Sequence, residues 1–323
     1  MALLHALHQL APKYRWQLTV AHFNHRLRGR SSAADERLVR RTAAKLKLPL
    51  VIESADVKQF APAHKLSIEM AARQLRHDFF ARTARRSNIR IVALAHHADD
   101  QVELFFLRVL RGAGGEGLAG MKWRTPSPAA KGIDLIRPLL DLTKPELLAF
   151  AKAQKFKYRE DATNAGADFL RNRIRNELIP LLQKEYQPGI AKTVLRLMDI
   201  VSAEAGVVGG LAETWLARPE PSFAQLPVAV QRRVLQAQLL RLNVPSDFEL
   251  IEALRVAVGV AVAVSPQVSV KRNENGKVEL AGSDPAVFNL GETSVDLTGR
   301  AGRVKFDGLA LDWKFAAGTG VSG

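Results

Sequence analysis

The sequence predicts an α/β protein built on a doubly wound parallel sheet, followed by a helical region and a small β-containing region. Three observations lead to this prediction. Strand-like apolar runs alternate with helix-like amphipathic runs through the first half of the chain, as in successive βαβ units. One run, Ile89–Ala95, is almost entirely apolar, as expected for a strand covered on both faces. Polar residues follow these runs directly, where parallel strands present their carboxyl ends to ligands.

The individual elements follow from hydrophobic periodicity. A helical pattern covers Met1–Leu10. Strands are expected at Gln17–Asn24, Leu48–Glu53, Ile89–Ala95 and Asp134–Leu140. Helices are expected at Asp35–Leu46, Ser67–Ala84, Ala98–Leu110 and Lys144–Gln154. In the helix at Ser67–Ala84, the predicted apolar stripe is Ile68, Ala72, Leu75 and Phe79.

The character of the chain changes around Pro188. Helical patterns follow at Thr193–Leu216, Val228–Leu242 and Phe248–Val258, and short β patterns alternate with turns from about Val262 onward. We therefore predict three domains: an α/β domain at 1–187, a helical domain at 188–262 and a small β-rich region at 263–323. The oligomeric state cannot be read from these patterns.

Composition narrows the range of functions. The formal net charge is +15, from 47 Lys and Arg against 32 Asp and Glu, which favours a polyanionic partner; a protein from a generally basic proteome is the alternative. The absence of cysteine excludes disulfides, thiolate metal sites and cysteine nucleophiles. The sequence shows no apolar run of membrane-spanning length and no signal-peptide pattern at Met1–Leu10. We expect a cytoplasmic protein without a membrane partner.

The densest cluster of polar residues is His96, His97, Asp99 and Asp100, between the third predicted strand and the helix after it. A helix cap is the simpler interpretation, because Asp100 and Glu103 have capping-box spacing. Two histidines and two aspartates exceed what a cap needs, however. Carboxylates at this edge suit Mg²⁺ or the polar groups of a nucleotide, whereas adjacent histidines cannot easily converge on one zinc ion.

Two earlier segments carry further candidates. His22, Asn24 and His25 lie where the first strand ends, a place that commonly receives a base or ribose. Glu69, Arg73 and Arg76 share one helical face. That face is either a solvated, ion-paired surface or a pair of guanidiniums aimed at a triphosphate or RNA.

Arginines also cluster in two later segments. Gly112–Gly117 matches G-x-G-x-x-G but follows a helix instead of opening one, so we reject a Rossmann dinucleotide site and expect a helix stop and a flexible loop. Arg108 and Arg111 beside it could meet phosphate. Arg171, Asn172 and Arg175 belong to the run RNRIRN, which is either a solvated helix or, after the run EDATN, the edge of a site.

Taken in order, the runs AHFNHRLRG, SIEMAARQLR, ALAHHADDQVE, LRGAGGEGLAGM, IRPLLD, EDATN and RNRIRNELIP closely resemble the tRNA(Ile)-lysidine synthase family of N-type ATP pyrophosphatases. The resemblance covers roughly Met1–Leu182 and continues more weakly into Phe223–Leu242. It implies an adenine nucleotide alpha hydrolase-like fold for 1–187 and a helical, tRNA-binding role for 188–262.

The resemblance implies ATP-dependent ligation of L-lysine to C2 of the wobble cytidine of the isoleucine tRNA with a CAU anticodon. ATP and Mg²⁺ are the implied cofactors. Asp99, Asp100 and Arg73 would be catalytic, with both aspartates at the metal. The implied ATP-binding residues are His22, Asn24, His25, Glu69, Arg76, His96 and His97. The implied tRNA-binding residues are Arg108, Arg111, Arg171, Asn172 and Arg175.

One departure from the family is severe. The family's S-G-G-x-D-S loop and the strand before it should precede the helix that here begins at Met1, and this sequence contains neither. That strand should lie between the strands at Gln17 and Ile89. We therefore expect the chain as given to be catalytically impaired. The alternative function is a non-catalytic RNA-binding remnant. A tRNA thiolase is disfavoured by the lack of cysteine, and a nicotinamide-dependent oxidoreductase rests only on the misplaced glycines.

Overall fold

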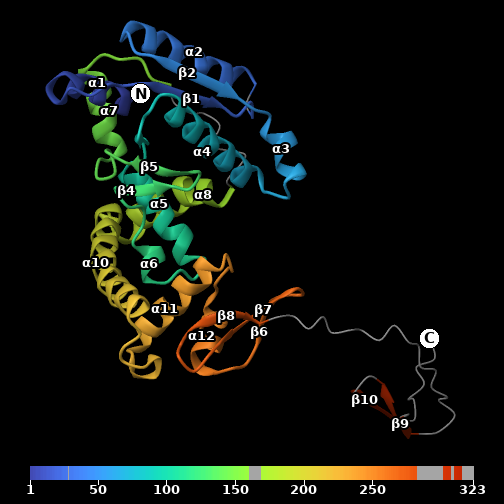
Figure 1. Ribbon diagram of the computed structural model, residues 1–323. Helices are drawn as coiled ribbons and strands as arrows, with labels where there is room; N and C mark the ends of the chain where they lie inside the picture. The colour runs from blue at the N-terminus through green and yellow to red at the C-terminus, as the bar shows by residue number, and fades with distance from the viewer. Residues whose placement is uncertain (28, 160–168, 282–300, 307–308, 315–323) are drawn as a thin grey trace. The chain divides into compact units, whose positions relative to one another are not determined.

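The computed structural model describes residues 1–27, 29–159, 169–281, 301–306 and 309–314 of the chain (Figure 1). The chain divides into two compact units, Met1–Val207 and Val208–Gly323. The three-domain division at 187 and 262 stays a prediction. Among the described residues, no helix is long and apolar enough to cross a bilayer.

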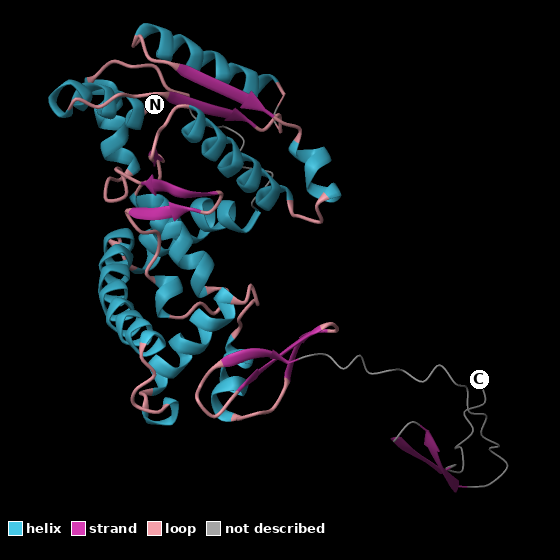
Figure 2. Cartoon of the chain, in the orientation of Figure 1, coloured by secondary structure: helices cyan, strands magenta, loops and turns pink. Residues whose placement is uncertain are grey.

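The described residues of the first unit form five strands in two sheets (Figure 2). The strands are β1 (Val20–Asn24), β2 (Leu50–Ser54), β3 (Ile91–Ala93), β4 (Arg124–Ser127) and β5 (Ala130–Ile136). β1 pairs in parallel with β2, and β3 pairs in parallel with β5. β4 lies antiparallel on the other edge of β5. The α/β alternation is confirmed, but the described strands form two separate sheets instead of one.

Helices connect and cover these strands. They are α1 (Ala2–Tyr14), α2 (Arg30–Lys45), α3 (Val57–Ala63), α4 (Ile68–Arg86), α5 (Ala98–Val109), α6 (Gly115–Leu118) and α7 (Lys144–Ala153). A helical run follows as α8 (Phe169–Arg173), η1 (Ile174–Leu178), α9 (Ile179–Leu181) and η2 (Leu182–Tyr186), in which η1 and η2 are π-helical. The predicted helices of this unit are confirmed within a few residues at each end, except α2, which begins five residues earlier than expected.

Helix α4 contacts strands of both sheets, β1, β3 and β5. Its start is fixed by Ser67, whose hydroxyl accepts a hydrogen bond from the backbone N of Met70 at 3.2 Å, an N-cap. Phe79 is fully buried and its ring lies 5.5 Å from that of Phe23 on β1. The predicted stripe was therefore right at Phe79 but wrong at Ile68, which is 42% exposed at the first turn of the helix.

Two other expectations needed correction. The predicted strand Asp134–Leu140 begins earlier, at Ala130, and forms a hairpin with β4, which the sequence did not indicate because Arg124–Ser127 is mostly polar. The glycine-rich run does stop α5, with Gly112 in the left-handed region at φ 70°. It is not a loop throughout, however, because Gly115–Leu118 forms the short helix α6.

The second unit begins at Val208, within the long helix α10 (Ile190–Ala217). It continues with a 3₁₀ turn η3 (Phe223–Gln225), α11 (Val228–Arg241), α12 (Phe248–Val256), β6 (Val262–Ser265), β7 (Val268–Arg272), β8 (Val278–Ala281), β9 (Ala301–Phe306) and β10 (Leu309–Lys314). Strands β6, β7 and β8 form an antiparallel sheet, and β9 pairs with β10. The helices and β patterns predicted here are confirmed. The core includes Val234, Leu235, Leu239, Leu254 and Val270, all fully buried.

Candidate active site

The junction between β3 and α5 places two histidines and two aspartates together. His97 is the N-cap of α5, and its backbone N donates to Asp100 Oδ2 at 3.0 Å. The capping box thus joins His97 to Asp100; the expected pairing of Asp100 with Glu103 was wrong, because the helix begins at Ala98. Asp99 Oδ2 accepts from the backbone N of Lys144 at 2.7 Å and lies 3.4 Å from His97 Nδ1. Both aspartates therefore help to fix this helix start.

These contacts also set the charge at the junction. The hydrogen bond with Asp99 raises the pKa of His97, against the opposing effect of burial. Burial disfavours ionisation of Asp99, but the hydrogen bonds from His97 and from Lys144 N outweigh it, so the pKa of Asp99 is lowered. Asp99 is consequently ionised at neutral pH, with a side chain that is 42% exposed.

One turn further along α5, Glu103 is 2% exposed and holds two arginines. It accepts from Arg171 Nε at 2.8 Å and from Arg175 Nη2 at 2.8 Å. Arg171 Nη2 also donates to Asp100 Oδ1 at 2.9 Å. We call Asp100, Glu103, Arg171 and Arg175 the acid–base cluster. It contains two carboxylates and two guanidiniums, and it attaches the run RNRIRN to α5.

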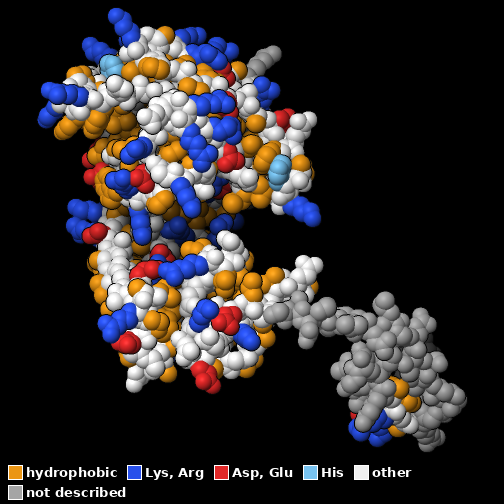
Figure 3. All heavy atoms as spheres, viewed as in Figure 1, with side chains coloured by type: hydrophobic (Ala, Val, Ile, Leu, Met, Phe, Trp, Pro, Cys, Tyr) orange, Lys and Arg blue, Asp and Glu red, His pale blue; other side chains and the backbone are white. Residues whose placement is uncertain are grey.

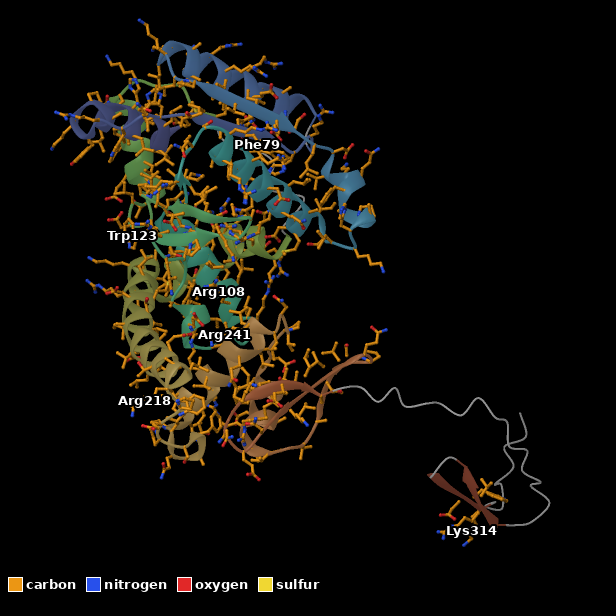
Figure 4. All side chains as sticks on the ribbon, in the orientation of Figure 1. Phe79, Arg108, Trp123, Arg218, Arg241 and Lys314 are labelled. Carbon is orange, nitrogen blue, oxygen red and sulfur yellow. The ribbon has the colours of Figure 1, made fainter. Side chains whose placement is uncertain are left out.

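Four other arginines form a group without carboxylates. Arg73 and Arg76 lie on α4, Arg108 near the end of α5 (Figure 4) and Arg137 directly after β5. Burial, and then the positive charge of Arg73, lower the pKa of Arg76, of Arg108 and of Arg137. We call these four residues the arginine cluster. Within the described part of the chain, no Asp or Glu makes an ion pair with any of them.

Arg137 is the most buried member of the arginine cluster, at 8% exposure. Its Nη1 donates to the backbone O of Lys122 at 2.8 Å and to Thr125 Oγ1 at 3.3 Å. Its Nε is buried without a hydrogen-bond partner among the described residues. An unsatisfied buried donor is costly, and a guanidinium is suited to phosphate oxygens. Arg137 can therefore offer a donor to an anion.

Two histidines beside the arginine cluster are held neutral. Burial, followed by the charges of Arg76 and Arg73, lowers the pKa of His77 to about 4. Burial also lowers the pKa of His96 to about 4; Arg137 and Arg76 add to this effect, and Asp100 opposes it. At neutral pH both rings are uncharged, and each can donate a hydrogen bond from one ring nitrogen and accept one at the other.

The remaining predicted site residues lie apart from these clusters or in structural contacts. Asn24 donates to Glu36 Oε2 at 3.0 Å, which ties the end of β1 to α2. The His25 ring packs edge-on against Phe23, with ring centroids 4.9 Å apart. His22 is half-buried, and burial lowers its pKa. The structure brings neither Glu69 nor Arg111, both exposed, nor Asn172 into a described contact with either cluster.

The run EDATN, which includes Glu160, lies outside the described residues. Sequence reasoning missed Glu103 as a partner of the arginines, and it missed Arg137 and His77. A signal existed for Arg137, since a lone arginine follows an apolar run within IRPLLD. Glu103 and His77 had none that distinguishes them from ordinary helix residues.

The fit of Mg²⁺ can be judged from the carboxylates. Among the described residues, no group of three His, Cys, Asp or Glu could enclose a metal ion. Mg²⁺ usually takes only one or two carboxylates and completes its shell with water and substrate phosphates. Asp99 fits this requirement because it is ionised and partly exposed. Asp100 fits it less well, since its oxygens already accept from His97 N and Arg171.

The fold defines an α/β protein with parallel strand pairs and a cationic site, and comparison with known proteins identifies the family. The PP-loop domain family ATP_bind_3 matches residues 1–182, so the chain belongs to the PP-loop family. Its curated relatives include tRNA(Ile)-lysidine synthases from Geobacter sulfurreducens, 41% identical, and from Symbiobacterium thermophilum, 33% identical.

The extent of these matches is partial. The Geobacter match covers 63% of this chain and 42% of the relative, and the Symbiobacterium match covers 75% and 53%. A bifunctional protein TilS/HprT from Listeria monocytogenes is 34% identical over 67% of this chain and 33% of the relative. The chain thus spans about half, or less, of the length of these relatives. A solved U34-tRNA thiolase from Methanococcus maripaludis aligns with a TM-score of 0.49 at 14% identity over 62% of this chain and 68% of that one, which is a distant similarity.

Proposed function

We propose that this chain is the PP-loop part of an enzyme that ligates L-lysine to C2 of the wobble cytidine of the isoleucine tRNA with a CAU anticodon. The names of the curated relatives support this substrate, and the PP-loop family supports the use of ATP. The observation that carries the proposal is the arginine cluster, an uncompensated group of cations beside the neutral ring of His96.

In the proposed reaction, the C2 carbonyl oxygen of the cytidine attacks the α-phosphate of ATP and pyrophosphate leaves. The ε-amine of lysine then attacks C2, AMP leaves with the oxygen, and the amine loses a proton. The first step concentrates negative charge on the departing pyrophosphate. Cations placed beforehand in a partly desolvated site stabilise such charge strongly. We assign this role to Arg73, Arg76 and Arg137.

We assign the other predicted residues according to their contacts. His96 and His97 would donate to or accept from the nucleotide, and Asp99 would be the main Mg²⁺ ligand, with Asp100 beside it. Bound Mg²⁺ would neutralise phosphate charge. Arg171 and Arg175 would position Asp100 through the acid–base cluster. Their predicted contact with tRNA would use the parts of the two guanidiniums that remain exposed. Arg108, Arg111 and Asn172 remain proposed tRNA contacts, and His22, Asn24, His25 and Glu69 remain proposed ATP contacts.

We also propose that the 323-residue chain by itself is impaired. Its sequence contains no S-G-G-x-D-S run, whose backbone N–H groups would cradle phosphate. Among the described strands, β1 pairs only with β2, and β3 pairs only with β5. One edge of each strand therefore lacks a described partner, as expected if a further strand belongs between them.

The test is ATP-dependent incorporation of labelled lysine into an isoleucine tRNA transcript with a CAU anticodon, with a UAU-anticodon transcript as the control. The chain is compared with a version extended at its amino terminus by a strand and an S-G-G-x-D-S loop. We expect much greater incorporation by the extended version, with release of AMP and pyrophosphate. Binding of both transcripts without incorporation by either version would favour the RNA-binding remnant instead.

A further inference from the structure

A pair of aromatic side chains lies on the surface where α1 ends. Tyr14 is 51% exposed and Trp16 is 45% exposed. Their rings are stacked, with centroids 4.9 Å apart and planes 18° from parallel. Large aromatic groups are usually buried or in contact with a partner. This pair is therefore a candidate recognition surface.

The backbone holds the pair in place. Arg15 adopts the left-handed conformation at φ 56°. Its N–H donates to Pro12 O at 3.4 Å, and the N–H of Trp16 donates to Ala11 O at 2.9 Å. This is the hydrogen-bond pattern of a Schellman helix end, and it turns Trp16 back toward the last turn of α1. The aromatic pair is thus presented by an ordered helix terminus.

A hollow of about 360 Å³ adjoins the pair. It is lined by His8, Ala11, Pro12, Arg15, Trp16, Leu18 and Leu48. None of these described lining residues is acidic. One wall is the indole, and Arg15 and His8 supply polar groups beside it. The hollow is large enough for a flat ring and offers the guanidinium of Arg15 next to it.

The surroundings carry a large excess of positive charge. Lys13 Nζ lies 5.4 Å from the centroid of the Tyr14 ring. The first 47 residues contain ten Lys and Arg against two acids, Asp35 and Glu36. Figure 3 shows Lys and Arg side chains over the region of α1 and α2. This charge is complementary to a polyanion.

We propose that Tyr14, Arg15, Trp16 and the adjoining hollow bind an unpaired nucleotide of RNA. Aromatic rings stack on bases without sequence preference, and neighbouring cations meet the phosphates. Leu18 and Leu48 precede β1 and β2, so this surface lies at the amino ends of those strands. Of the predicted nucleotide residues, Asn24 and His25 lie at the carboxyl end of β1, and His22 lies at its middle. A five-residue strand separates its two ends by about 17 Å, so this RNA contact is distinct from the proposed ATP contacts.

The test measures binding of a dye-labelled ten-nucleotide oligouridine to the full chain by fluorescence anisotropy at about 0.1 M salt. We expect the double variant Tyr14→Ala, Trp16→Ala to bind at least about tenfold more weakly, from the loss of base stacking. The matched control is Trp123→Ala. Trp123 (Figure 4) is 53% exposed and also has a Lys and an Arg as chain neighbours; its replacement should change the affinity less than about twofold. Circular dichroism verifies that both variants fold.

A second variant separates charge from stacking. Arg15→Gly keeps the left-handed conformation, which glycine adopts freely, and removes one cation. We expect weaker binding and a salt dependence reduced by about one phosphate contact. The proposal would be overturned by no measurable binding of the oligonucleotide, by unchanged affinity of the double variant, or by an equal loss in Trp123→Ala. It would also be overturned if the double variant converted a dimer to a monomer in sedimentation while RNA affinity stayed the same. None of these readouts depends on lysine incorporation.

Discussion

The acid–base cluster and the arginine cluster of the first unit differ in whether carboxylates pair with their arginines. In the acid–base cluster, Glu103 pairs with Arg171 and Arg175, and Asp100 pairs with Arg171, at 2.5–2.9 Å. In the arginine cluster, burial and then the charge of Arg73 lower the pKa of Arg76, of Arg108 and of Arg137, and no described carboxylate pairs with any of the four. The first arrangement is compensated internally and serves packing. The second is uncompensated and is suited to an external anion.

The largest test of this contrast is Glu103→Gln. The substitution keeps the shape of the side chain but leaves two guanidiniums without their shared carboxylate. Removing one partner of a buried ion pair typically costs 3–5 kcal/mol. Arg171 and Arg175 are about one-third exposed, so we expect a loss of about 3 kcal/mol in the free energy of unfolding. Urea denaturation measures it. An unchanged free energy would show that the acid–base cluster does not serve packing.

Burial, together with the nearby charges of Arg76 and Arg73, should instead make the region of the arginine cluster sensitive to acid through His77. The pKa of His77 is about 4 in the folded chain and about 6.5 when unfolded. Since the folded value is the lower one, the unfolded chain takes up a proton at His77 first as the pH falls. The free energy of unfolding therefore keeps its full value above pH 6.5 and decreases as the pH falls toward 4. The difference corresponds to about 3 kcal/mol between pH 7 and pH 4.

The variant His77→Asn checks this prediction, because it removes the titrating ring. We expect its free energy of unfolding to fall less steeply between pH 7 and pH 4 than that of the unmodified chain, in parallel urea titrations. Equal slopes for the two proteins would contradict the placement of a neutral ring beside the arginines.

A substitution in the arginine cluster should lower ATP affinity more than stability, which is the reverse of the effect expected for Glu103→Gln in the acid–base cluster. Arg76→Met removes a cation that has no described ion pair, so we expect an unchanged or slightly increased free energy of unfolding. ATP affinity should fall about tenfold, the usual value of one charge-assisted hydrogen bond. Isothermal titration with MgATP measures it. If Arg76→Met lowered stability without changing ATP affinity, the arginine cluster would be structural too.

The smallest effect on stability and on ATP affinity is expected for Arg173. This arginine lies in the run RNRIRN with Arg171 and Arg175 but belongs to neither cluster. It pairs with Glu177 at 3.2 Å on the helix surface, and the two side chains are 57% and 64% exposed. Exposed pairs at this spacing contribute about 0.3–0.5 kcal/mol. Arg173→Met should therefore change both the unfolding free energy and ATP affinity very little, which makes it the control for both clusters. A loss as large as that of Glu103→Gln would mean that the run as a whole, and not its buried pairs, decides stability.

The sequence by itself determined the order of the elements and the position of the polar junction. Helices such as α4, α5 and α11 follow from apolar spacing and capping residues within a few turns, which are local properties. The histidines and aspartates after β3 could be located for the same reason, since a strand end and a helix start are adjacent in the chain.

Only the tertiary structure decided which charges are compensated. Arg171 and Glu103 are 68 residues apart. The spacing of Arg171 and Arg175 places them on one helical face, but nothing in the run RNRIRN indicates that Asp100 and Glu103 meet them there. The role of Arg137 and the hairpin of β4 with β5 were likewise hidden. Burial and charge pairing depend on which distant segments pack together, whereas periodicity reports only on the segment in which it occurs.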